Sequence, residues 1–140
     1  MKGIILHGGH GTRLRPLTHT GPKQLLPIAN KPMSQFCLEA IFETGITEIA
    51  IIIGGVGSNK VREYYGDGNK FGVKITYIEQ KEALGTAHAL KTAIPYVKSD
   101  NLLVLLGDVP LLSRRTIKKL KEQNNGPRKT SARLWIVLVV

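Results

Sequence analysis

The chain has 140 residues, of which 42% are hydrophobic and 21% are charged, and its formal net charge is +10. This length suits one domain with its own core, and the composition argues against disorder. No apolar run approaches the roughly 20 residues that a membrane-spanning helix needs, and the N-terminus lacks a signal-peptide pattern, so we expect a soluble cytoplasmic protein without a membrane partner.

The positive charge is spread along the chain and forms no arginine-rich tract. Its densest cluster, residues 114–121, falls on a predicted amphipathic helix, where cations are most simply a solvated face. We therefore expect no nucleic-acid partner, and a basic nucleic-acid-binding domain is the weakest alternative. The four histidines lack the spacing of a zinc site, and Cys37 lies in an apolar helical pattern that predicts a buried thiol.

Short apolar runs bounded by glycine alternate with segments in which apolar residues recur at helical spacing. The predicted strands are Lys2–Leu6, Glu48–Ile53, Val73–Glu79 and Leu102–Leu106. The predicted helices are Met33–Thr44, Ser58–Tyr65, Thr86–Val97 and Ser113–Gln123. Gly45 is predicted to end the first helix and Ser58 to cap the second, and four prolines argue against a long helix across residues 14–31.

This alternation predicts an α/β fold, a Rossmann-like three-layer α/β/α arrangement with a mostly parallel sheet and helices on both faces. The tail Gly126–Val140 ends in an apolar run that could add one more strand, and no helix follows it. We therefore expect a fold that is incomplete at its C-terminus.

The segment Leu6–Met33 carries the clearest functional signal: it opens with a cluster of three glycines, continues with two arginines and reaches Lys23 behind a proline. Glycines let backbone N–H groups approach a phosphate closely, and cations balance its charge. The segment is not a Walker A loop, because no Gly-Lys-Ser/Thr closes it, and Leu14 stands where a dinucleotide fingerprint needs its third glycine. The pattern favours a triphosphate-binding turn, and a plain βα turn with solvated arginines is the alternative.

Asp108 is a second candidate, because it follows the most apolar predicted strand. Ligands of parallel sheets bind at the carboxyl ends of the strands, so Asp108 and the glycine loop are expected to face one cleft. An aspartate there is costly to bury without a partner, which favours a metal ligand. A turn or N-cap aspartate before Pro110 is the alternative.

The segments LHGGHGTRL and PKQLLPIANKPM resemble the signature of the sugar-1-phosphate nucleotidyltransferases, or sugar-nucleotide pyrophosphorylases. The resemblance continues through GITEIAIIIGG, GDGNKFGVKITYIEQ, LGTAHAL and LLGDVPLL, and covers roughly residues 1–125. Residues 1 to about 78 look most like glucose-1-phosphate thymidylyltransferases, whereas EALGTAHALKTA and LLGDVPLLS look more like N-acetylglucosamine-1-phosphate uridylyltransferases. The resemblance implies that dTTP or UTP reacts with a sugar 1-phosphate, preferably glucose 1-phosphate, to give a nucleotide sugar and pyrophosphate.

Carried onto this sequence, the resemblance implies a set of nucleotide-binding residues near the N-terminus, in which Gly8, Gly9, Gly11 and Thr12 cradle the phosphates. The set is Leu6, Gly8, Gly9, Gly11, Thr12, Arg13 and Lys23. Arg13 would stabilise the pyrophosphate leaving group, and Lys23 would bridge the α-phosphate and the sugar phosphate. A surface lysine in a proline-rich loop is the alternative for Lys23. His7 stands where the family usually has alanine, a change that is harmless if the backbone at this position is what contacts the nucleotide.

The resemblance also implies base-binding and metal-binding residues further along the chain. Gln80 would read the base edge, Gly85 would let the backbone approach the base, and Thr86 would bind the nucleotide or cap the next helix. Asp108 would hold Mg²⁺ and, with Arg13 and Lys23, complete the catalytic set. A polar residue ending a strand is the alternative for Gln80, and His88 is expected on the helix surface.

The resemblance places the sugar pocket and a second acidic metal ligand in a further segment of roughly a hundred residues. We therefore expect residues 1–125 to be the N-terminal, nucleotide-binding part of the domain and residues 126–140 to be an atypical tail from truncation or a shifted frame. A nucleotide-binding protein without turnover is the alternative function. The oligomeric state is open, with a homo-oligomer among the alternatives.

Overall fold

The computed structural model describes residues 1–8, 14–19, 21–55, 57–82, 84–97, 101–123 and 134–137. The strands are β1 (Lys2–Leu6), β2 (Pro27–Ile28), β3 (Lys31–Pro32), β4 (Glu48–Ile53), β5 (Lys74–Glu79), β6 (Leu102–Leu106) and β7 (Leu134–Val137). The α-helices are α1 (Met33–Phe42), α2 (Ser58–Tyr65), α3 (Thr86–Thr92), α4 (Ile94–Val97) and α5 (Arg114–Gln123), and the 3₁₀ turns are η2 (Lys23–Leu25) and η3 (Asn69–Phe71). None of the helices in these ranges has the length and apolar surface that crossing a bilayer requires.

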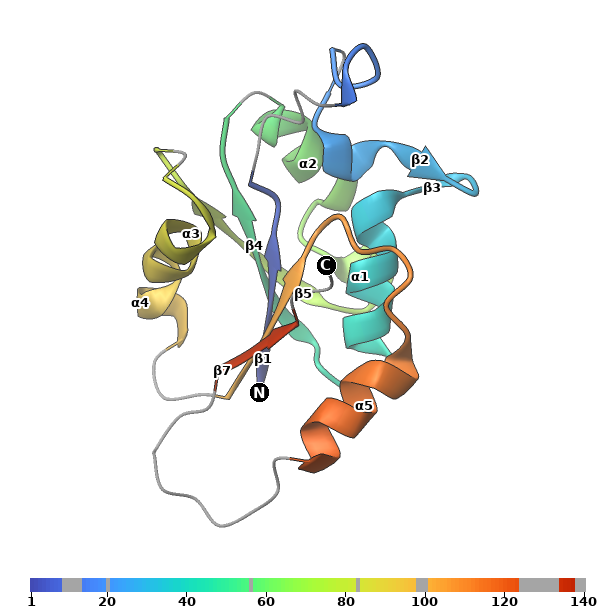
Figure 1. The fold of residues 1–140 in the computed structure, drawn as a ribbon, viewed down its shortest axis with the longest axis vertical. Coiled ribbons are helices and arrows are strands. Elements are labelled where there is room, and N and C mark those ends of the chain that lie inside the picture. The colour runs from blue at the N-terminus through green and yellow to red at the C-terminus, as the bar shows by residue number, and fades with distance from the viewer. Residues whose placement is uncertain are drawn as a thin grey trace.

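A five-stranded parallel sheet forms the middle layer of the molecule (Figure 1), in the order β5-β4-β1-β6-β7. The chain steps outward from β1 through β4 to β5, and then crosses to the other side of β1 for β6 and β7. Doubly wound sheets bind ligands where the strand order reverses, at the carboxyl ends of the strands. Here that point lies between β1 and β6.

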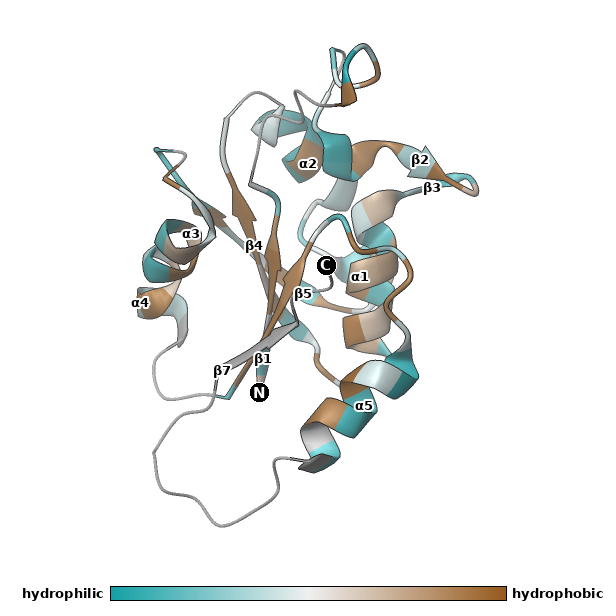
Figure 2. Cartoon of the chain, in the orientation of Figure 1, coloured by the Kyte–Doolittle hydropathy of each residue, from teal (hydrophilic) through white to brown (hydrophobic). Residues whose placement is uncertain are grey.

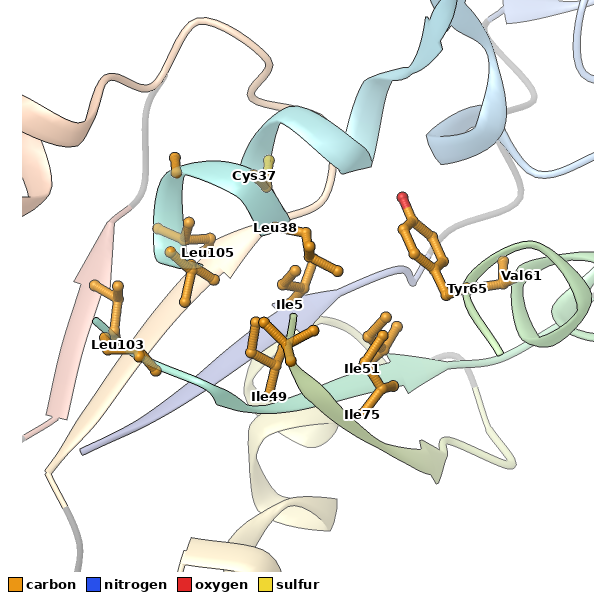
Figure 3. Close-up of a cluster of buried hydrophobic side chains, with 14 of the residues drawn as sticks. Ile5, Cys37, Leu38, Ile49, Ile51, Val61, Tyr65, Ile75, Leu103 and Leu105 are labelled. Carbon is orange, nitrogen blue, oxygen red and sulfur yellow. The ribbon is translucent and has the colours of Figure 1, made fainter. Parts of the chain in front are cut away.

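Side chains of alternate residues along each strand point to opposite faces of the sheet, and each face has its own core. On one face, Ile5 packs with Leu38 of α1 and Tyr65 of α2 (Figure 3). On the other face, Ile4 packs with Ala89 of α3. Figure 2 shows the hydrophobic strands enclosed by helices with mixed surfaces. The three-layer arrangement predicted from the sequence is therefore confirmed.

Most predicted elements agree with the structure to within two residues, and the apolar tail supplies β7, which pairs with β6. The helix predicted over residues 86–97 is instead two helices, α3 and α4, separated at Ala93. The reason is Pro95, which has no N–H to donate and whose ring conflicts with the carbonyl of residue 91. Gly45 has the positive φ angle, +81°, expected of a glycine that ends a helix.

The predicted cap of α2 is wrong. Gly57 occupies the N-cap with a φ angle of +91°, and Ser58 donates its hydroxyl to the carbonyl of Gly55 at 2.8 Å. A Cβ on Gly57 would lie 2.6 Å from Cδ of Pro22, so this close contact with a distant segment requires glycine.

The proline-rich segment folds into the single turn η2 and the small antiparallel ladder of β2 and β3. Ala29 and Asn30 take positive φ angles of 46° and 67° in the connecting turn, the conformation that two-residue hairpins favour. The backbone N–H of Met33 then donates to the carbonyl of Leu26 at 2.9 Å, where α1 begins. These contacts fix η2, and Lys23 with it, beside the end of β1.

Candidate active site

A cavity of about 290 Å³ opens at the carboxyl edge of the sheet, where the strand order reverses. It is lined by Leu6, Gly8, Lys23, Gln80, Gly85, Thr86, Ala89, Leu106 and Asp108. All of these except Ala89 and Leu106 are residues that the sequence predicts for the site. Gly9, Gly11, Thr12 and Arg13, the other predicted site residues, lie outside the described residues.

Lys23 and Asp108 meet in this cavity. Nζ of Lys23 donates a hydrogen bond to Oδ2 of Asp108, although the two residues are 85 positions apart. Their side chains are 24% and 33% exposed, so the ion pair is partly shielded and still accessible from the cavity. The two charges that the sequence assigns to a phosphate and to a metal neutralise each other in this structure.

Gln24 fixes the start of the glycine loop, and the sequence analysis did not identify it. Its side-chain Nε2 donates to the backbone carbonyl of Gly8 at 3.1 Å, and its backbone carbonyl accepts from Oγ of Ser34 at 3.0 Å. Ser34 also bonds the hydroxyl of Tyr65 at 2.6 Å. This buried chain ties the loop to α1 and α2. Its only sequence signal is that Gln24 adjoins Lys23 in the recognised motif.

Gln80 lies at the end of β5, with its side chain on the cavity wall and only 7% exposed. Its backbone N–H donates to the carbonyl of Ile53 at 2.8 Å. A Cβ on Gly54 would lie 2.7 Å from the carbonyl oxygen of Gln80, so glycine is required there. Nε2 of Gln80 lies 3.3 Å from the carbonyl of Gly85 and 3.1 Å from Nδ1 of His88. His88 is half-buried and contacts a site residue, so the expectation of a plain surface histidine is wrong.

His7 is buried between Leu6 and Gly8, which line the cavity, and 3% of its surface is exposed. Its backbone N–H donates to the carbonyl of Ile52 at 2.8 Å, whereas neither ring nitrogen has a hydrogen-bond partner among the described residues. Burial lowers the pKa of His7 to about 3, although the nearby charge of Asp108 opposes this. The ring is therefore neutral at neutral pH and fills space beside Tyr65, 6.0 Å between ring centres.

Cys37 of α1 contacts the backbone on both sides of Asp108 in the sequence. Its buried thiol donates to the carbonyls of Leu106 and Val109, with sulfur–oxygen distances of 3.3 and 3.5 Å. Burial raises the pKa of Cys37 to about 11, so the thiol is protonated at neutral pH. The prediction of a buried thiol is confirmed.

Comparison with known proteins agrees with this geometry. The family model described as nucleotidyl transferase matches residues 2–130. The chain belongs to the nucleotidyl transferase family. It is 51% identical over 108 residues to a low-salt glycan biosynthesis nucleotidyltransferase from Haloferax volcanii and 50% identical over the same length to a glucose-1-phosphate thymidylyltransferase from Streptomyces antibioticus. Each match covers 77% of this chain and 30% of the relative.

A crystal structure described as a glucose-1-phosphate thymidylyltransferase from Bacillus anthracis, in complex with a sucrose, superposes with a TM-score of 0.78 at 36% identity. That superposition covers 90% of this chain and 52% of the other. The nucleotidyl transferase chain thus spans about a third to a half of the length of these relatives.

Asp108 offers this nucleotidyl transferase a Mg²⁺ ligand of the right chemistry, because its carboxylate faces the cavity and Mg²⁺ prefers hard oxygen donors. Within the described ranges, no three His, Cys, Asp or Glu side chains gather around a common point. Mg²⁺ is commonly held by one or two carboxylates together with water and phosphate oxygens. One carboxylate at the cavity, beside the start of the glycine loop, therefore fits that ion.

Proposed function

We propose that this chain is a sugar-1-phosphate nucleotidyltransferase that uses dTTP or UTP and glucose 1-phosphate in nucleotide-sugar biosynthesis. The observation that carries the proposal is the convergence of Lys23, Asp108 and Gln80 on one cavity beside Gly8. A site for a nucleoside triphosphate needs a cation and a glycine loop for the phosphates and a carboxylate that can hold a metal ion. It also needs a polar side chain that can hydrogen-bond the base. The thymidylyltransferase names of two similar proteins support this choice of substrates. Residues 1–125 supply the nucleotide-binding part of the activity.

The proposed reaction is an in-line displacement at the α-phosphorus. An oxygen of the sugar phosphate forms a bond to that phosphorus as the bond to the bridging oxygen of the β-phosphate breaks, and this oxygen leaves with pyrophosphate. No covalent nucleophile from the protein is needed, so catalysis consists of positioning and of stabilising negative charge. Mg²⁺ bound at Asp108 would neutralise part of the charge of the triphosphate.

Lys23 and Arg13 have different tasks in this proposal. The ammonium of Lys23, which pairs with Asp108 in this structure, turns to the α-phosphate and the sugar phosphate and reduces their mutual repulsion. Arg13 stabilises the pyrophosphate leaving group. The backbone at Gly8, Gly9 and Gly11, with Thr12, cradles the phosphates. Gln80, Gly85 and Thr86 bind the base, and Leu6 lines the same wall.

The test is pyrophosphate release from dTTP and UTP with glucose 1-phosphate and Mg²⁺, measured beside nucleotide binding by calorimetry. Lys23→Ala and Asp108→Asn should each lower kcat/KM by roughly 100-fold or more, because each removes a group that stabilises transferring charge. Matched controls are Lys118→Ala and Glu63→Gln, which change exposed charges that do not line the cavity.

Release that is unchanged in both cavity variants would rule out the assigned site. Nucleotide binding without release in the unmodified chain would instead support a nucleotide-binding protein without turnover. Binding to DNA or RNA that nucleotides cannot displace would favour the basic-domain alternative.

A further inference from the structure

The orientation of the Gln80 amide follows from its two contacts. Nε2 lies 3.3 Å from the carbonyl oxygen of Gly85, which can only accept a hydrogen bond. The atom of the Gln80 amide that faces this carbonyl must therefore be the NH₂ nitrogen. The same carbonyl also accepts from the backbone N–H of Ala89 at 3.1 Å, so Gly85 joins the first turn of α3 to Gln80.

The second contact fixes the tautomer of His88. Nε2 of Gln80 lies 3.1 Å from Nδ1 of His88. An amide NH₂ group donates two hydrogen bonds and accepts none, so Nδ1 of His88 must be the acceptor. His88 is then a neutral imidazole with its proton on Nε2. Both hydrogens of the Gln80 NH₂ group are thereby engaged, one by Gly85 and one by His88.

The oxygen of the Gln80 amide is the atom left for a ligand. Oε1 has no donor among the residues that the structure describes, and a Cβ built on Gly8 would lie 3.5 Å from it. Oε1 therefore points toward the start of the glycine loop, into the cavity that Gln80 and Gly8 both line. An amide oxygen only accepts, so the complementary group on a ligand is an N–H.

We propose that His88 is a positioning residue for base recognition, which holds the Gln80 amide so that Oε1 accepts a hydrogen bond from the imide N–H of a uracil or thymine ring. This inference rests on the proposed nucleotidyltransferase function and adds to it a residue that does not itself line the cavity. Without His88, one N–H of Gln80 loses its partner, and the amide is free to rotate and offer its NH₂ group to the base.

The experiment measures binding of three ligands by calorimetry: UTP, 3-methyluridine triphosphate, in which a methyl group replaces the imide hydrogen, and inorganic tripolyphosphate, which has no base. The unmodified chain should prefer UTP over the methylated nucleotide by roughly 10-fold, the worth of about one hydrogen bond. His88→Leu should weaken UTP binding by roughly 10-fold and reduce the preference to about twofold or less, because the freed amide can turn away from the methyl group.

His88→Asn is the matched variant, because the side-chain oxygen of asparagine can accept a hydrogen bond close to where Nδ1 of histidine does. It should restore the preference for UTP, whereas a merely structural role for the imidazole would not be rescued by this smaller side chain. Tripolyphosphate should bind all three proteins equally, since it does not contact Gln80.

A His88→Leu protein that keeps the full preference for UTP would overturn the positioning role. So would a loss of tripolyphosphate affinity that equals the loss of UTP affinity, because the change would then not concern the base. If the unmodified chain binds neither UTP nor tripolyphosphate, the proposed function fails and this inference fails with it. If it binds tripolyphosphate and UTP without discriminating the methylated base, only this inference fails.

Discussion

Gly107 separates the buried ring of His7 from the catalytic candidate Asp108. A Cβ on Gly107 would lie 2.6 Å from Cδ2 of His7 and 3.0 Å from the carbonyl oxygen of Leu6. Neither neighbour can retreat easily, because the ring is buried and the carbonyl belongs to the central strand. Gly107→Ala should therefore lower the free energy of unfolding by roughly 1–3 kcal/mol, as overpacking does, measured by urea denaturation.

The matched control for this prediction is Gly21→Ala. Among the described residues its added Cβ would meet only the side chain of Lys60, at an ordinary 3.7 Å from Cδ and 4.0 Å from Nζ. It should change stability by no more than about 0.5 kcal/mol. In a His7→Ala background the closer contact is absent, so Gly107→Ala should cost less there than it does in the unmodified chain. An equal effect of Gly107→Ala with and without the ring would show that His7 is not the obstacle.

Some residues of the candidate site could be predicted from sequence motifs, and others could not. Lys23, Gln80 and Asp108 were predictable because they stand in recognised segments at or beyond strand ends, and all three line one cavity. Gln24 and His88 were not predictable as site residues. Gln24 matters because it bonds Gly8, and His88 because it contacts Gln80, and both contacts exist only in the folded chain.

Gly45 gives a test at the scale of the helix. It is exposed with a φ angle of +81°, and a Cβ there would meet no atom of the described residues within 4 Å. Backbone strain is therefore the only cost of a side chain, so Gly45→Ala should destabilise the protein by roughly 1–2 kcal/mol. Gly45→Asn should cost less, because asparagine tolerates the left-handed region. Thermal and urea unfolding would measure both, and equal costs would contradict this explanation of how α1 ends.

Elements were predictable wherever the hydrophobic period decided them. The buried strand β4 and the helix α1 both follow from apolar spacing. The cap of α2 was not predictable, because Gly57 is required by contact with Pro22, which lies far away in the sequence. Pro95 could have predicted the division between α3 and α4. The apolar periodicity of the segment indicated one continuous helix instead.

At the scale of the whole molecule, the alternation of strands and helices predicted three layers. The order of the strands in the sheet was not predictable and is known only from the structure. An order that reverses between β1 and β6 brings Gly8 and Asp108 to one cavity. Several strand orders satisfy the same alternation, because the hydrophobic pattern of a fully buried strand does not identify its neighbours.

The stability of the whole molecule should depend on the protonation of His7. The folded chain holds the pKa of His7 at about 3, against 6.5 for a free histidine. Between these two values the unfolded chain binds a proton that the folded chain does not, so stability is complete above pH 6.5 and falls as the pH decreases toward 3. The maximal slope is roughly 1.4 kcal/mol per pH unit, so lowering the pH from 7.5 to 5.5 should cost about 1 kcal/mol.

Urea unfolding at these two pH values measures that difference, and the comparison needs no absolute stability. In His7→Ala the loss between pH 7.5 and 5.5 should shrink by about 1 kcal/mol, even though the cavity left by the ring lowers stability at both values. The exposed His19 provides the control, because His19→Ala should leave the loss unchanged. If His7→Ala keeps the full loss, the folded chain accommodates a protonated imidazole at position 7. Its burial, and ring nitrogens without a hydrogen-bond partner among the described residues, argue against this.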